Sequence, residues 1–186
     1  MTASAPSLPR TTSGLPMLAL IVALLALPFV IAGGLYLTGW QPERSGNHGT
    51  LLSPPPVLPL ENGELQGKWL LILAGRGPCD ATCAARIDEM RRIQVSLNKD
   101  MGRLRRVVLS DMASDGVLGD FRRRQPDLVI AAAPPEWLPC AGADGTAYRF
   151  YLGDPQGRMI MSYQPEVAGK AVRADLDRLL RFSWAG

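Results

Sequence analysis

The sequence of 186 residues contains a single histidine, His48, and it lies outside the segments that predict a domain core. Serine–histidine–aspartate catalysis therefore has little basis in this chain. The sequence also lacks a Walker loop, a G-x-G-x-x-G turn and an H-E-x-x-H helix, so it offers no motif for nucleotide binding or zinc proteolysis. Its arginines occur in short clusters without aromatic platforms beside them, and the net charge is only +3. We therefore expect no nucleic-acid partner.

Charge is missing altogether from residues 11–42, and most of that stretch is apolar. A membrane-spanning helix needs about 20 such residues. Residues 15–40 therefore predict a transmembrane helix in the lipid bilayer, preceded by a short N-terminal tail at 1–14. A cleaved signal peptide is the alternative, with Val30-Ile31-Ala32 as its cleavage site. We favour an uncleaved anchor, because the apolar run continues beyond that site and Arg10 is the only basic side chain before it.

The basic residues that flank this span are nearly balanced, with Arg10 on one side and Arg44 on the other. The free N-terminal amine tips the count slightly towards a cytoplasmic N-terminus. We therefore expect a single pass through a bacterial inner membrane, with the C-terminal domain in the periplasm. Paired cysteines can be oxidised in that compartment.

The rest of the chain divides into a spacer and a domain. Residues 41–66 predict an extended Pro-rich spacer, or an edge segment laid against the domain, because their prolines exclude a helix and a central strand. Residues 67–186 alternate between strand and helix patterns and then give a hairpin and a last amphipathic helix. This order predicts an α/β, thioredoxin-like mixed sheet flanked by helices. The expected strands are 69–74, 106–110, 128–132, 148–152 and 159–163, and the expected helices are 80–97, 117–124 and 172–180.

Two cysteines, Cys79 and Cys83, follow the first predicted strand. Asp80 is expected to cap the next helix, with Cys79 just outside it and Cys83 in its first turn. Free backbone N–H groups at a helix N-terminus stabilise a thiolate, so the pattern indicates thiol chemistry or copper handling. In a redox reaction the more exposed Cys79 would attack and Cys83 would resolve. A purely structural bridge would close a tiny loop and stabilise little, which favours a chemical role.

The cysteine spacing C-x3-C after a buried strand resembles the Sco/SenC family. The hairpin turn Leu152-Gly153-Asp154-Pro155-Gln156-Gly157 also resembles a Leu-x-Asp-Pro-x-Gly turn of that family. Sco/SenC proteins are membrane-anchored thioredoxin-fold factors that deliver copper to cytochrome c oxidase. The chain is more closely similar to small proteobacterial transmembrane proteins associated with cytochrome oxidase assembly. That similarity is carried by Asn47-His48-Gly49, Gly67-Lys68-Trp69, Gly77-Pro78-Cys79 and Gly153-Asp154-Pro155.

Two positions depart from the Sco pattern. Sco proteins carry a proline directly after the first cysteine, where this chain has Asp80, and they place a metal-binding histidine near the position of Thr146. Only Cys79 and Cys83 therefore match the family's copper site. Cu(I) prefers thiolate ligands and also accepts imidazole. Cys140, in the loop before the hairpin, and His48 are accordingly the candidates for a third ligand. Taken singly, a small buried cysteine and a surface histidine are the alternative interpretations of these two residues.

The sequence thus predicts a membrane-anchored accessory factor for cytochrome c oxidase assembly. Its Cys79 and Cys83 would hold Cu(I) or keep a partner's thiols reduced, and the partner would be an oxidase subunit or another assembly factor. Two alternatives stay open. One is an enzyme, a periplasmic thiol–disulfide oxidoreductase, although enzymes of that type use C-x2-C spacing. The other is a non-catalytic, thioredoxin-like interaction module.

Overall fold

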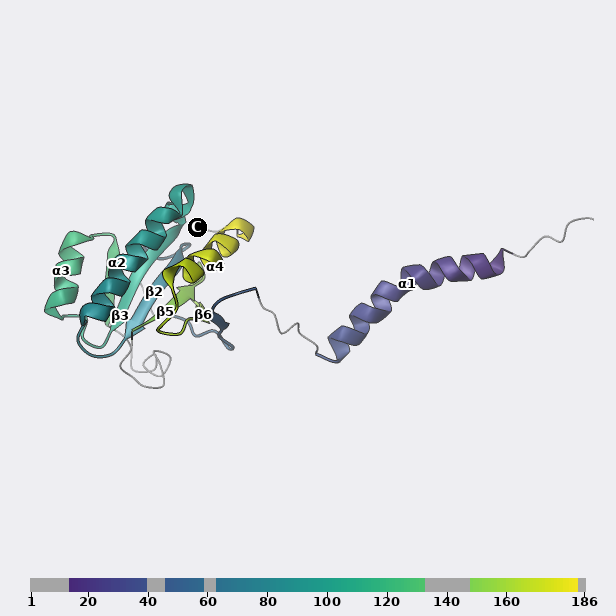
Figure 1. Ribbon diagram of the computed structural model, residues 1–186, viewed down its shortest axis with the longest axis horizontal. Coiled ribbons are helices and arrows are strands. Elements are labelled where there is room, and N and C mark those ends of the chain that lie inside the picture. Colours follow the sequence, from purple (N-terminus) through teal and green to yellow (C-terminus); the bar gives the residue numbers. More distant parts are fainter. Residues whose placement is uncertain (1–13, 40–45, 59–62, 133–147, 184–186) are drawn as a thin grey trace, which may run out of the picture. The chain divides into compact units, whose positions relative to one another are not determined.

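The computed structural model describes residues 14–39, 46–58, 63–132 and 148–183 (Figure 1). The chain divides into two units, Met1–Ser45 and Gly46–Gly186. We describe each unit separately.

Within residues 14–39, the described part of the first unit, the chain forms helix α1 at Leu15–Leu37. Its 23 residues have a mean hydropathy of 2.7 over the most apolar window, and none of that window is buried. At 1.5 Å per residue the helix is about 35 Å long, slightly more than the apolar thickness of a bilayer. Among the described residues it is the one helix long and apolar enough to cross a membrane. The predicted span is thus a helix that ends three residues earlier than expected.

The second unit is built on a six-stranded mixed sheet with the strand order β1-β6-β5-β2-β3-β4. Strands β2, β3 and β4 are parallel, whereas β5, β6 and β1 are added in antiparallel fashion. The strands are β1 Thr50–Leu51, β2 Trp69–Gly75, β3 Leu104–Ser110, β4 Leu128–Ala132, β5 Arg149–Gly153 and β6 Met159–Ser162. The helices are α2 Ala81–Ser96, the 3₁₀ helix η1 Asn98–Arg103, α3 Gly116–Arg124 and α4 Gly169–Phe182. This arrangement confirms the predicted thioredoxin-like fold class.

The continuous apolar run of β2 explains its central place, because every one of its residues is buried between β3 and β5. Helices α2 and α4 lie side by side over one face of the sheet (Figure 1). Their buried faces supply Ile87 and Met90 from α2 and Val172 and Leu176 from α4 to the larger core cluster. The apolar stripes that predicted two amphipathic helices are therefore the packing surfaces of those helices.

The segment before β2 joins the sheet instead of only connecting the two units. Strand β1 pairs with β6, Val57 forms a bridge with Arg158, and Leu58 is buried. The unit that contains the sheet begins at Gly46, and the Pro-rich segment supplies the edge segment that was one of the two expectations for it. Proline is tolerated at a sheet edge, and β1 uses two residues that precede the proline run.

Candidate functional site

Cys79 and Cys83 form a disulfide at the junction between β2 and α2. Helix α2 begins at Ala81, and its N-cap Asp80 accepts the N–H of Cys83 at 2.8 Å. The predicted cap and the predicted placement of both cysteines are therefore confirmed. Both cysteines are buried in the larger core cluster, which differs from the expectation of an exposed pair. The exposed fraction is 4% for Cys79 and 0% for Cys83, so Cys79 is the more exposed of the two, as expected.

The backbone amides around the disulfide differ from the sequence expectation. We expected free N–H groups at the helix start, but the N–H of Cys79 donates to Asp115 Oδ2 at 2.8 Å and that of Cys83 donates to Asp80. The N–H of Gly77 similarly donates to Asp111 Oδ1 at 2.8 Å. The amides of Gly77, Cys79 and Cys83 thus already have carboxylate acceptors. Among the described residues, the amides of Ala81 and Thr82 in the first turn of α2 have none, so the expectation holds for these two only.

Asp111 and Asp115 belong to the segment between β3 and α3, and the sequence reasoning missed both. A signal was present, because they directly follow a strand that pairs in parallel with β2. The carboxyl ends of parallel neighbours meet at one edge of the sheet, which brings these side chains to the cysteine loop. Asp115 also caps α3, where it accepts the N–H of Val117 at 3.4 Å.

Tyr148 completes the surroundings of the cysteine loop, just before β5 begins. Its hydroxyl donates to the carbonyl of Gly77 at 3.0 Å and lies 2.9 Å from Ser110 Oγ. Its ring packs on Gly75, where an added Cβ would lie 2.6 Å from a ring carbon, so this approach requires glycine. Burial raises the pKa of Tyr148, the hydrogen bond with Ser110 lowers it, and three nearby aspartates raise it further.

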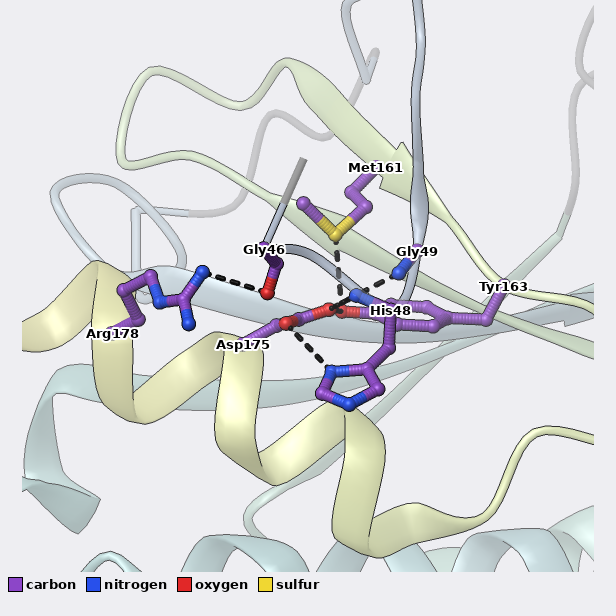
Figure 2. Close-up of polar contacts among 7 residues, drawn as sticks. All are labelled: Gly46, His48, Gly49, Met161, Tyr163, Asp175 and Arg178. Carbon is purple, nitrogen blue, oxygen red and sulfur yellow. Dashed lines mark hydrogen bonds and ion pairs between the residues drawn. The ribbon is translucent and has the colours of Figure 1, made fainter. Parts of the chain in front are cut away.

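His48 lies on a different cluster, centred on the buried carboxylate of Asp175 in α4 (Figure 2). Asp175 is 2% exposed and accepts four hydrogen bonds: from the N–H and Nδ1 of His48 at 2.9 and 3.1 Å, from the N–H of Gly49 at 3.1 Å, and from the Tyr163 hydroxyl at 3.0 Å. Gly49 packs so closely on Met161 that an added Cβ would lie 2.5 Å from its Cγ. Through these hydrogen bonds, Asp175 holds His48 and Gly49, near the start of the second unit, against its last helix, α4.

The four predicted metal ligands do not come together at one described site. The structure joins Cys79 and Cys83, but it places His48 beside β1, which β6 and β5 separate from β2. Three interstrand spacings correspond to about 14 Å. Cys140 and Thr146 lie outside the described residues. Within the described ranges, no group of three His, Cys, Asp or Glu side chains is arranged to hold a metal ion.

Tyr163 gives the Asp175 cluster a testable pH dependence. Burial raises the pKa of its phenol above the usual 10.0, and the charge of Asp175 and the hydrogen bond to it raise it further. The unfolded chain therefore loses this proton first as the pH rises. We expect stability from this group to be complete below pH 10 and to fall above it by about 1.4 kcal/mol per pH unit. Urea unfolding of the wild type and of Tyr163→Phe at a series of pH values above 10 measures how the free energy of unfolding depends on pH. The same pH dependence in both proteins would contradict the assignment to Tyr163.

Comparison with known proteins places the chain in a family. The family model of a transmembrane-like, thioredoxin-like, C-terminal domain matches residues 69–183, and the chain belongs to this family. No curated protein matches.

Among solved structures, apo Sco1 from Thermus thermophilus is similar, with a TM-score of 0.51 and 21% identity over 72% of this chain and 96% of that one. Copper-bound ScoI from Bradyrhizobium japonicum has a TM-score of 0.43 and 20% identity over 61% and 86%. A DsbF homologue from Corynebacterium diphtheriae has a TM-score of 0.48 and 15% identity over 75% and 98%. The similarity to the Thermus thermophilus structure confirms the resemblance to Sco/SenC proteins at the level of the fold.

Proposed function

We propose that this protein is a membrane-anchored accessory factor for cytochrome c oxidase assembly, which keeps a partner's thiols reduced through Cys79 and Cys83. The observation that carries the proposal is the disulfide at the β2–α2 junction of a thioredoxin-like fold. Helix α1 anchors the protein in the bacterial inner membrane, and the folded unit faces the periplasm. Thiols of a partner subunit are open to oxidation there, so they need a local reductant.

The reaction begins from the dithiol form of the pair. The Cys79 thiolate attacks one sulfur of the partner's disulfide, which forms a mixed disulfide and releases the first partner thiolate. The sulfur of Cys83 then attacks that of Cys79, closes the Cys79–Cys83 disulfide and releases the second partner thiol. Two electrons have passed to the partner, and a dithiol reductant of the same compartment restores the pair.

The contacts of the cysteine loop support the reducing direction. Strong disulfide oxidants owe their strength to a stabilised reduced form. Here the amides of Cys79 and Cys83 donate to Asp115 and Asp80, so the reduced sulfurs gain nothing from them. The negative charge of both carboxylates further disfavours an anionic thiolate at this position.

Cu(I) handling is the second candidate, with the ion as cargo. Two adjacent sulfurs in the reduced protein offer a soft, two-coordinate site, which favours this candidate. The described residues do not complete a three-ligand site around the pair, and Cys140 lies outside them. We therefore derive no step through copper.

A paired measurement on the reduced full-length protein in detergent separates these candidates. We expect it to reduce a disulfide-bonded test peptide, whether or not the dithiol also retains Cu(I) against a competing chelator. Stoichiometric binding that is lost in Cys79→Ser and Cys83→Ser, without peptide reduction, would establish the copper role instead. If the protein does neither, and both serine variants still support oxidase assembly, it is an interaction module.

A further inference from the structure

We propose that Asp115 is a positioning residue for the Cys79–Cys83 pair and that it makes this pair a stronger reductant. The inference rests on the proposed function, and it assigns part of the reduction potential of the Cys79–Cys83 pair to one side chain. Asp115 contributes one carboxylate oxygen to each of two elements: Oδ2 accepts the N–H of Cys79, and Oδ1 accepts the N–H of Val117 at the start of α3. Cys79 is thus tied to a helix 36 residues further along the chain.

The hydrogen bond from the N–H of Cys79 to Asp115 is important because Cys79 lies just outside α2. Cys83 is held by the helix itself and by its bond to Asp80. The backbone that carries Cys79 is instead held from β3 and α3, through Asp111 at Gly77 and through Asp115 at Cys79 itself. None of these contacts involves a sulfur atom, so all of them are available to the dithiol form. Asp115 therefore keeps the Cys79 sulfur close to that of Cys83 after reduction.

Two physical effects of this contact act in the same direction. A dithiol held in the geometry of its disulfide loses less entropy on closing, which raises the effective concentration of one thiol at the other. The carboxylate charge also disfavours the thiolate and hence the reduced form. Both effects favour the disulfide over the dithiol, and a pair that prefers its disulfide readily gives electrons to a partner. Asp115 accordingly lowers the reduction potential of the pair.

The test is the equilibrium of the pair with dithiothreitol in the full-length protein. Redox state is fixed by alkylation and read by mass spectrometry on the peptide that contains both cysteines, so Cys140 does not interfere. In Asp115→Ala we expect the equilibrium constant for disulfide formation to fall about tenfold, which corresponds to a potential about 30 mV higher. Asp115→Asn removes the charge and retains one acceptor oxygen, which can serve the N–H of Cys79 or the α3 cap but not both. Its constant should fall between those of Asp115→Ala and the wild type.

Asp120→Asn is the matched control, since Asp120 is an exposed aspartate of the same helix that pairs with Arg123. We expect it to keep the wild-type constant. A residue with a purely structural role would lower the melting temperature without moving the exchange constant. Wild-type constants in both Asp115 variants would therefore overturn this inference and leave the proposed function standing. A wild-type pair that does not exchange with dithiothreitol at all would instead overturn the proposed function.

Discussion

In a strain that lacks this protein, Cys79→Ser is expected to give no recovery of cytochrome c oxidase activity, whereas the wild type restores it. The reason is that neither the attack on a partner's disulfide nor the closure of the Cys79–Cys83 bridge can occur with one sulfur. Cys83→Ser should lose oxidase activity as well, because it forms the mixed disulfide but does not resolve it. The measurement is oxidase activity in membranes, normalised to the amount of each variant.

Thr82→Ser is the matched control for these variants, since Thr82 is an exposed residue between the two cysteines. It changes the same turn of α2 without removing a sulfur, and full recovery is expected. Loss of the small bridge should cost little stability, so the serine variants should accumulate normally. Full oxidase activity in both serine variants would contradict the redox role.

The second large effect is expected for Asp175→Ala, which should lower the free energy of unfolding by about 3 kcal/mol or more. The change removes the acceptor of four hydrogen bonds. It leaves the N–H of Gly49 and the hydroxyl of Tyr163 without their buried anionic partner. Three of these bonds hold His48 and Gly49 on α4, so this segment should also loosen, although the bond from Arg178 to the carbonyl of Gly46 remains. Urea unfolding measures the loss, and amide hydrogen exchange of His48 and Gly49 measures the loosening.

Asp177→Ala serves as the control, because Asp177 lies on the same helix and its contact is a half-exposed pair with Arg173. An exposed pair of this kind contributes about 0 to 1 kcal/mol. A small and equal effect of the two alanine substitutions would show that the Asp175 cluster does not hold the start of the unit.

Local pattern was sufficient to predict the elements that surround the cysteines. The apolar run at 69–74 predicted a covered strand, and the position of Asp80 predicted the start of α2. The strand–helix order then predicted the thioredoxin-like sheet, because few arrangements of such elements are available. These features depend on neighbours within a few residues, which a single sequence displays directly.

Contacts between distant segments were not predictable in the same way. Asp115 meets Cys79 across 36 residues, and Asp175 meets His48 across 127. Asp175 has the spacing of an ordinary helix residue, and no periodicity marks it. Asp115 lies in the segment after β3, where only the parallel pairing of β2 and β3 brings it to the cysteines. His48 therefore resembled a free ligand in the sequence, whereas in the structure its ring binds a buried carboxylate. The sequence likewise left the Pro-rich segment as either a spacer or an edge segment, and the pairing of β1 with β6 decides for the edge.

The most direct test of the central claim is to trap the reaction intermediate in the cell. Cys83→Ser retains the attacking sulfur and lacks the resolving one, so a mixed disulfide through Cys79 should accumulate. After rapid alkylation and non-reducing electrophoresis, we expect a reducible species whose second component is an oxidase subunit or another assembly factor. It should be missing from the Cys79→Ser, Cys83→Ser double variant. If Cys83→Ser yields no such species while oxidase assembly proceeds normally, the account is contradicted.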